Sequence, residues 1–388
     1  MRQKLRYLDY SILIPYLVLS TIGVIMVYSA SSDILLVNGF SPSVYMKRQI
    51  IYFLAAFIAF GIPCFALKLR VFKNRKIVMS YLGMVLIVLK IVSHGKAAVN
   101  GAVGWINLGF INIQPVEVAK LSLVLYLAFV LSRRDGKFIP GQIWHNLFGP
   151  TVISFLMIGL VILEPDFGGS AILFMIVFVM YSVSGIPTRL AVYWLVGLLL
   201  GIVLLMAILL FWTPGFIKDS YQFQRLLAFA HPFKLEKTGG AQLVNSYYAI
   251  HNGGLFGVGL GNSMQKRGYL PEPYTDFILS ITAEELGVIG AIVIITLLFF
   301  LMWRIMEVGI HADSQFNALV CFGVVTMIFT ETLFNVGAVL GLLPITGVTL
   351  PFISYGGSSM IVLTAALGLV LNISAAEKKA LVESRSVL

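Results

Sequence analysis

Residues 269–278, with the sequence YLPEPYTDFI, lead from a long polar loop into an apolar run that extends to about residue 303. This transition predicts that the chain enters a membrane here, with the carboxylate of Asp276 at the membrane surface. Two interpretations of Asp276 follow. It can be the catalytic residue of a site, or, together with Thr275, it can satisfy the free N–H groups and the dipole of an ordinary helix N-terminus.

The composition determines the class of protein. Of the 388 residues, 59% are hydrophobic and 11% are charged, which is too little polar surface for a soluble globule and indicates a polytopic membrane protein. The two cysteines, Cys64 and Cys321, both lie in apolar stretches. They are therefore interpreted as buried hydrophobic residues rather than as a disulfide or a metal site.

Several apolar windows are long enough to cross a bilayer as helices, which takes about 17 to 25 residues. We place ten of them near residues 10–30, 48–67, 76–93, 115–132, 147–163, 168–185, 189–212, 277–303, 314–340 and 355–374. The predicted fold class is therefore all-α, in a single integral membrane domain over residues 1–388. The first window is too long for the apolar part of a signal peptide, about 7 to 15 residues, and is expected to remain as an anchor.

Lysine and arginine in the short loops set the orientation, because they are retained on the cytoplasmic side. They precede the first window and fill the loops at residues 68–76 and 133–137, so both termini are expected to be cytoplasmic. The large loop at residues 214–275, between the seventh and eighth windows, is then extracellular. Its basic residues do not contradict this, since the rule weakens for loops beyond about 60 residues. They belong either to a solvated loop or to a site for an anionic partner such as a diphosphate.

A polar stretch at residues 100–110 leads into the predicted helix 115–132. Pro115 suits the first helical position, so Glu117 lies in the first turn and Lys120 follows three residues later on a neighbouring face. The two charges are either an ion pair at a helix start or part of a functional site, because charges buried in a membrane are costly.

Two further pairs of acidic residues are unusual for their depth. Glu164 and Asp166 flank a proline in a tight turn on the outer side, where they either cap a helix or bind a divalent cation through oxygen ligands. Glu284 and Glu285 follow Asp276 by eight and nine residues. A helix would place Glu284 about 12 Å farther along its axis, so neither forms a close carboxylate pair with Asp276. At least one of them is expected to face a polar partner inside the bundle.

The last informative segment is LPITGVTLPFISYGGSS, residues 343–359. Its two prolines and three glycines interrupt any helix at membrane depth. Irregular backbone is tolerated there only where protein or a water-filled cavity covers it. We therefore expect this segment to be covered by the rest of the bundle.

Together these motifs resemble the SEDS family of bacterial cell-wall proteins, named for shape, elongation, division and sporulation. The resemblance is carried by residues 107–120, 164–166, 271–278, 284–287 and 351–358. It covers nearly the whole chain, in order and with a matching number of helices. Residues 261–266 and 347–350 are more similar to the division-type members than to the elongation-type members. The chain departs from the family at Pro273-Tyr274, where a small residue followed by histidine is more common, so Tyr274 is given no catalytic role.

The resemblance implies a peptidoglycan glycosyltransferase that polymerises lipid II into β-1,4 glycan strands on the outer face of the bacterial cytoplasmic membrane. For a division-type member, the strands serve septal wall synthesis. In such enzymes the aspartate that matches Asp276 is essential. The implied partners are lipid II, the growing glycan strand, a class B penicillin-binding protein acting as transpeptidase, and other divisome proteins. No nucleic acid is expected among them.

The chemistry requires a base for the acceptor hydroxyl and positive charge for the undecaprenyl diphosphate that leaves. Asp276 is the candidate base, provided that burial or a nearby acid offsets the helix N-terminus, which weakens its basicity. A single displacement at an α-linked donor inverts the anomeric carbon. A divalent cation, Mg²⁺ or Mn²⁺, could replace part of the positive charge, and Glu164 and Asp166 are its candidate ligands.

Basic residues of the outer loop and of the fourth helix are the candidate partners of the diphosphate, and arginine offers bidentate geometry. The full set of candidate substrate-binding residues is Trp105, Asn107, Glu117, Lys120, Arg225, Lys266, Arg267, Glu272, Ser354, Tyr355 and Ser358.

Three alternatives remain open at this stage. A transporter that flips lipid II across the bilayer would also need buried charges and broken helices. It should place essential charges through the full membrane depth, whereas most of the unusual polar residues here lie in the outer half. A scaffold that recruits division proteins predicts that Asp276 can be replaced without loss of function. An elongation-type polymerase would share the chemistry and differ in its cellular role.

Overall fold

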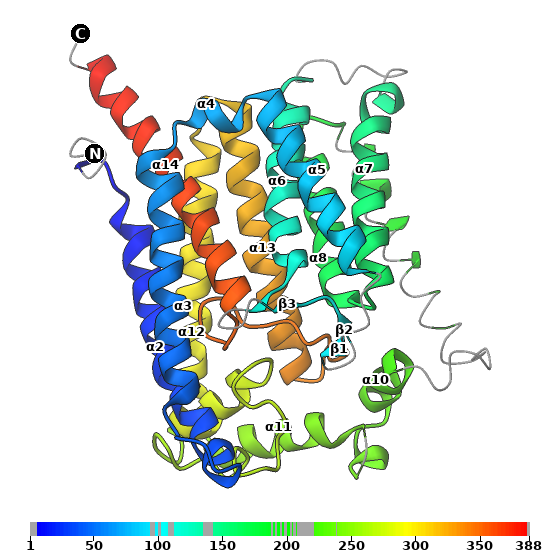
Figure 1. Ribbon diagram of the computed structural model, residues 1–388, viewed down its shortest axis with the longest axis vertical. Helices are drawn as coiled ribbons and strands as arrows, with labels where there is room; N and C mark the ends of the chain where they lie inside the picture. The colour runs from blue at the N-terminus through cyan, green and yellow to red at the C-terminus, as the bar shows by residue number, and fades with distance from the viewer. Residues whose placement is uncertain are drawn as a thin grey trace.

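The computed structural model describes residues 6–93, 98–99, 102–107, 112–134, 143–187, 189–190, 192–194, 196–197, 200–201, 204, 207, 221–237 and 239–385. These residues are mostly helical, as the sequence predicts (Figure 1). The α-helices are α2 (Tyr10–Val37), α3 (Val44–Gly61), α4 (Leu69–Phe72), α5 (Arg75–Val92), α6 (Pro115–Ser132), α7 (Ile143–Leu163), α8 (Phe167–Val183), α10 (Tyr221–Ala230), α11 (Ala241–Gly253), α12 (Ile278–Ile310), α13 (Gln315–Val339) and α14 (Gly357–Arg385). A π-helix, η1 (Ile62–Ala66), extends α3, and a 3₁₀-helix, η3 (Phe233–Leu235), precedes α11.

Two short hairpins precede α6. In the first, β1 (Ala98–Val99) pairs antiparallel with β2 (Ala102–Val103). In the second, β3 (Ile106–Asn107) pairs antiparallel with β4 (Asn112–Ile113), with Ile106 opposite Ile113. The polar stretch before the fourth predicted helix therefore contains extended backbone that leads directly into α6.

Seven of the described helices are long and apolar enough to cross a membrane, namely α2, α3 with η1, α6, α7, α12, α13 and α14. The apolar helix α8 is shorter, with 17 residues. The predicted span 76–93 coincides with α5, and the predicted span 189–212 lies largely outside the described residues. The all-α membrane class is confirmed, while the number of ten spans stays a prediction.

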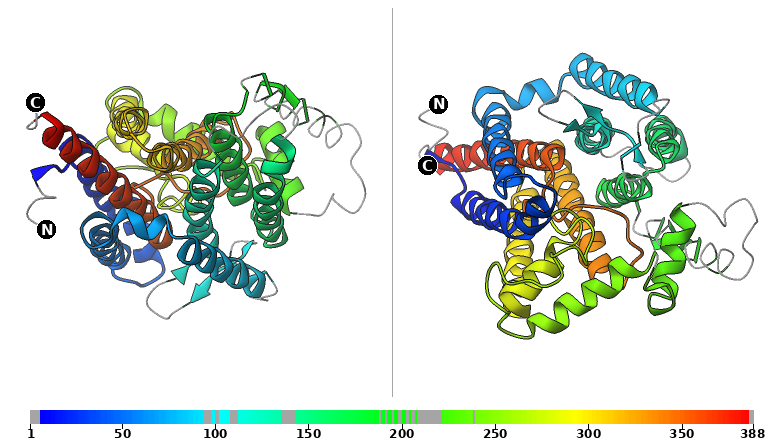
Figure 2. Two further views of the ribbon diagram at one scale, coloured as in Figure 1. Left: turned by 90° about the horizontal axis from the view of Figure 1, so that it is seen from above. Right: turned by 60° about the horizontal axis from the view of Figure 1, so that its bottom comes forward.

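The two ends of the bundle differ in the way the charge pattern predicts. Both chain ends lie at the same end as α4, which belongs to the basic loop 68–76 (Figure 1). Helices α10 and α11, from the loop 214–275, lie at the opposite end, where α11 runs across the bundle (Figures 1 and 2). This arrangement agrees with cytoplasmic termini and an extracellular large loop.

Helix α12 is interrupted at Gly287, which has φ +74°. The preceding loop closes on this break, because the N–H of Gly259 donates to the carbonyl oxygen of Glu285 at 3.0 Å. A Cβ on Gly287 would lie 2.2 Å from the carbonyl oxygen of Leu255, so the close approach requires glycine. The single span predicted near 277–303 therefore consists of two helical segments.

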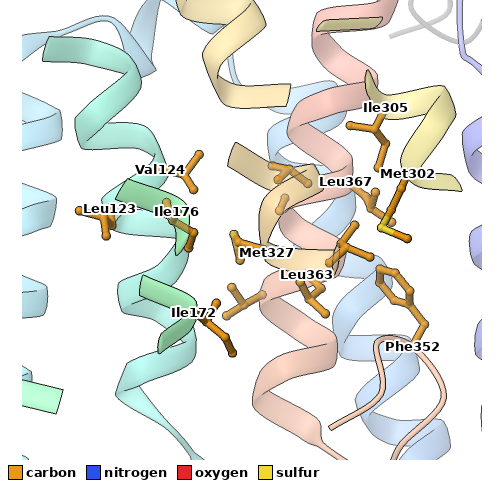
Figure 3. Packing of buried hydrophobic residues seen from close by; sticks show 14 of the residues in the cluster. Leu123, Val124, Ile172, Ile176, Met302, Ile305, Met327, Phe352, Leu363 and Leu367 are labelled. Atoms are coloured by element: carbon orange, nitrogen blue, oxygen red, sulfur yellow. The ribbon is translucent and has the colours of Figure 1, made fainter. Parts of the chain in front are cut away.

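The middle of the bundle is apolar (Figure 3). Val124 of α6 and Ile176 of α8 lie toward Met327 of α13, and all three are 0% exposed. The buried cysteines, Cys64 and Cys321, are free, which confirms their predicted role as hydrophobic residues. This core fixes α6, α8 and α13 relative to one another, and these helices position the polar residues described next.

Candidate active site

Asp276 lies in the turn before α12, and its side chain is half-buried. The hydroxyl of Thr275 donates to its carboxylate at 2.9 Å, and the amide of Asn335, from α13, donates to its backbone carbonyl at 2.8 Å. The residue before the first helical position is Phe277, and no side chain caps the helix. The capping interpretation of Asp276 is therefore wrong, because the helix begins two residues later and leaves its carboxylate available.

The surroundings of Asp276 favour a base. Burial raises the pKa of its carboxyl, while Thr275 and the nearby Arg225 lower it and Glu272 raises it. The net pKa lies above the ordinary value, so the carboxylate is a stronger proton acceptor than an exposed one. The sequence predicts that Asp276 needs burial or a nearby acid to act as a base, and the structure shows both, with Glu272 as the acid.

Arg225, on α10, connects Asp276 with a second carboxylate. Its guanidinium donates to the carbonyl oxygen of Ile345 at 3.0 Å and acts electrostatically on both Asp276 and Asp166. The sequence leaves open whether the basic residues of the large loop are incidental. The structure brings this one to the predicted catalytic residue.

Asp166 is the residue before α8, and its carboxylate accepts from the N–H of Gly169 at 2.7 Å. The capping interpretation is confirmed for this residue. The amide of Gln114 also donates to Asp166, at 3.2 Å. Burial raises the pKa of Asp166, and Lys120 and Arg225 act against it. Lys120, Asp166, Arg225 and Asp276 therefore form a row in which each charge acts on the next, and we refer to these four as the charged row.

Lys120 is 1% exposed and lies between two acids. Its ammonium is 2.8 Å from the carboxylate of Glu117, as the i,i+3 spacing predicts, and it also donates to Glu331 of α13. Glu331 belongs to none of the motifs that the sequence shows. The available signal was an acidic residue in the middle of the predicted apolar span 314–340, where a charge requires a partner.

The segment between α13 and α14 is irregular and lies beside the turn that carries Asp276. The N–H of Tyr355 donates to the carbonyl oxygen of Tyr274 at 2.9 Å, and their rings meet with centroids 5.8 Å apart. The hydroxyl of Ser354 accepts from the N–H of Leu350 at 2.8 Å within the same segment. Both side chains hold the backbone near Asp276, and burial of the segment agrees with the predicted protein cover.

Ser358 links the hairpin to α14. Its hydroxyl accepts from the N–H of Gln114 at 2.9 Å and donates to the carbonyl oxygen of Asn112 at 2.8 Å. Of the two predicted residues in the preceding stretch, Trp105 is half-buried and Asn107 is exposed. This stretch leads to Gln114, which precedes α6 and contacts Asp166 of the charged row.

Two residues predicted to bind the diphosphate, Lys266 and Arg267, form ion pairs with acidic residues of the protein itself. Lys266 is 1% exposed, and its ammonium lies 2.9 Å from the carboxylate of Glu285. Arg267 pairs at the surface with Asp33, at 3.6 Å. The adjacent Glu284 accepts from the hydroxyl of Ser263 and from two backbone N–H groups of the same loop. Both glutamates therefore face polar partners, where the sequence predicts at least one.

Glu164 lies close to Asp166, but its carboxylate is not hydrogen-bonded as that of Asp166 is. Its side chain is 1% exposed, and neither carboxylate oxygen has a hydrogen-bond partner among the described residues. Burial, with a further contribution from Asp166, raises the pKa of Glu164 to about 8. Among the residues that the structure describes, no group of three or more His, Cys, Asp or Glu could hold a metal ion. Glu164 and Asp166 would supply two ligands at most.

The raised pKa of Glu164 predicts a stability that depends on pH. The folded protein holds a proton that the unfolded chain releases, so stability should fall as pH rises from about 4.5 to about 8. Glu164→Gln should remove this part of the dependence and melt above the wild type at about pH 8.5. Melting temperatures of the purified protein across this range measure the effect. Glu236→Gln, at an exposed loop position, is the control, and an unchanged slope in Glu164→Gln would contradict the prediction.

Fold and site together define a polytopic membrane protein whose apolar bundle carries a charged, partly buried site at its predicted outer end. The profile of the FtsW, RodA and SpoVE family, described as cell cycle proteins, matches residues 10–379. The chain belongs to this family, which confirms the predicted resemblance.

Relatives of known sequence are similar over almost their whole length. A protein of Lactococcus lactis named "Probable peptidoglycan glycosyltransferase FtsW" is 41% identical, over 97% of this chain and 94% of the relative. A protein of Bacillus subtilis with the same name is 37% identical, over 96% and 92%.

Solved structures agree with the fold. One is a chain from a structure described as "Structural coordination of polymerization and crosslinking by a peptidoglycan synthase complex". It is 28% identical with a TM-score of 0.78, and the match covers 95% of this chain and 98% of that chain. The Rod shape determining protein RodA of Thermus thermophilus is 27% identical with a TM-score of 0.67 and covers 95% and 96%.

Proposed function

We propose that the protein is a peptidoglycan glycosyltransferase that polymerises lipid II on the outer face of the cytoplasmic membrane. The observation that carries the proposal is the half-buried carboxylate of Asp276 beside the guanidinium of Arg225 at the predicted outer surface. Relatives that share nearly the whole chain are named as probable peptidoglycan glycosyltransferases, which supports the same activity.

The charged row can supply both requirements of glycosyl transfer. The oxygen of the acceptor hydroxyl attacks the anomeric carbon of the donor, and Asp276 accepts the proton of that hydroxyl. The bond from that carbon to the diphosphate breaks, and undecaprenyl diphosphate leaves with its electron pair. Arg225 lies where its guanidinium can stabilise the diphosphate, since it already acts on Asp276. One displacement inverts the anomeric carbon and gives a β-1,4 link.

Lys120 fits a supporting role better than direct contact with substrate. It is buried between Glu117 and Glu331, and it acts electrostatically on Asp166. A divalent cation remains part of the proposal, with Glu164 and Asp166 as two ligands and the substrate diphosphate as a source of others. Bound there, Mg²⁺ or Mn²⁺ would add positive charge near the leaving group.

The proposed setting is septal wall synthesis with a class B penicillin-binding protein and other divisome proteins. Two observations support it: the division-type names of the relatives, and the similarity to a chain from a peptidoglycan synthase complex. An elongation role with the same chemistry is the alternative, since RodA shares the fold.

The test is a reconstitution of the purified protein with its cognate penicillin-binding protein. Supplied with lipid II in detergent, the pair should produce glycan polymer, resolved by gel electrophoresis. A second assay, in vesicles carrying fluorescent lipid II, measures transfer between leaflets. Polymer without transfer supports the proposal. Transfer without polymer, under conditions in which a related pair is active, would establish the transporter instead.

A further inference from the structure

A second polar site lies at the opposite, predicted cytoplasmic end of the bundle. A cavity of about 250 Å³ opens between the carboxyl end of α6, the residue after α4 and the start of α13. Since one water molecule occupies about 30 Å³ in the liquid, the cavity has room for a phosphate group with part of its hydration shell. The proposed glycosyl transfer, at the outer end, does not use it.

Two cations line the cavity. The ammonium of Lys73 donates to the hydroxyl of Ser314 at 3.0 Å and lies 5.2 Å from the ring centre of Phe316. The guanidinium of Arg133 lies 4.3 Å from the ring centre of Phe129 and donates to the backbone carbonyl of Lys73 at 3.5 Å. Each cation contacts an aromatic ring and lines the same cavity, so both can reach one anion there.

The other groups at the cavity also favour an anion. None of the described residues that line it is acidic, and Ser314, whose hydroxyl oxygen accepts from Lys73, can add a hydroxyl donor. The start of α13 lines the cavity through Ser314, Gln315 and Phe316, so the positive end of that helix dipole lies at the cavity. The negative end of α6 also reaches the cavity, and Arg133 at that position offsets it.

Burial makes the positive charge of Lys73 less favourable. Burial lowers the pKa of Lys73, and Glu377 acts in the opposite direction. The carboxylate of Glu377 accepts from the amide of Asn317 at 2.9 Å, which gives it a partner outside the cavity. A bound phosphate would stabilise the charged form of Lys73 directly.

We infer that this cavity binds the phosphate group of an anionic lipid from the cytoplasmic leaflet. The source is a lipid because the cavity lies where two predicted spans, α6 and α13, reach the membrane surface. Phosphate head groups of the inner leaflet are concentrated at this level, and basic pockets between transmembrane helices on this side are suited to them. The aromatic walls add apolar contact that a free phosphate ion would not use.

The test titrates the full-length protein in a neutral detergent with dioctanoyl phosphatidylglycerol and counts bound lipid by native mass spectrometry. The double variant Lys73→Gln/Arg133→Gln should bind at least about tenfold more weakly, because two charge-assisted hydrogen bonds are lost. The control Arg75→Gln/Lys76→Gln removes the same charge from exposed neighbouring positions and should change affinity by less than about twofold. Should the double variant fail to fold, the exposed single change Arg133→Gln should still weaken binding about fivefold.

Two probes identify the chemistry that is recognised. Dioctanoyl glycerol, which lacks the phosphate, should bind weakly, and inorganic phosphate should compete only at concentrations far above those of the lipid. Equal weakening in the cavity variant and in the control would overturn the inference, since general surface charge would then explain the binding. Competition by inorganic phosphate at the concentration of the lipid would overturn the lipid as its source. Binding of dioctanoyl glycerol as tight as that of phosphatidylglycerol would overturn phosphate recognition.

Discussion

Replacing Asp276 by asparagine should reduce glycan polymerisation by about 10² to 10⁴-fold while the protein still folds. The amide has the size of the carboxylate and can keep the hydrogen bond from Thr275, but it cannot accept the proton of the acceptor hydroxyl. Because burial raises the pKa of Asp276, the charged form is costly here, and the neutral amide should not lower stability. Gel analysis of polymer made with lipid II and the cognate penicillin-binding protein measures the loss.

The pH profile distinguishes a base from a structural residue. Polymerisation by the wild type should rise with pH as Asp276 loses its proton, at a higher pH than an ordinary aspartate requires. The residual activity of Asp276→Asn should lack this limb. Glu236→Gln, a change of the same kind at an exposed position of the outer loop, should keep both rate and profile. Polymer from Asp276→Asn at the wild-type rate would exclude this residue as the base.

Replacing Lys120 by methionine should destabilise the fold by about 3 to 5 kcal/mol. Methionine fills a similar volume but leaves Glu117 and Glu331 buried with no cation between them. The loss follows from two uncompensated carboxylates rather than from the value of the ion pairs themselves. Thermal unfolding of the detergent-solubilised protein, followed by size-exclusion chromatography after heating, gives the shift in melting temperature.

The exposed Lys379 provides the matched control. It pairs with Glu383 on the same helix at 3.5 Å, and Lys379→Met should cost less than about 1 kcal/mol because surface ion pairs contribute little. Adding Glu331→Gln to Lys120→Met should recover part of the stability, since one of the buried charges is removed. A double variant no more stable than Lys120→Met alone would show that Glu331 does not depend on Lys120.

The sequence alone determined those features that arise from neighbours along the chain. Composition gave the membrane class, apolar length gave most spans, and lysine and arginine in short loops gave an orientation that the ends of the bundle match. Pro115 at a helix start and the ion pair between Glu117 and Lys120 follow from helical geometry. Each depends on a few residues of separation, where 3.6 residues per turn fixes the neighbours.

Only the tertiary structure decided which distant residues meet. Lys120 and Glu331 are 211 residues apart, and no local pattern connects them. Packing also brings Arg225, one of several cations in the basic loop, to Asp276. It buries Lys266, from the same loop, against Glu285. The break at Gly287 depends on a loop that supplies an N–H to a carbonyl beside the break. Sequence patterns show where a charge is costly, but the packing of the helices selects the partner that offsets the cost.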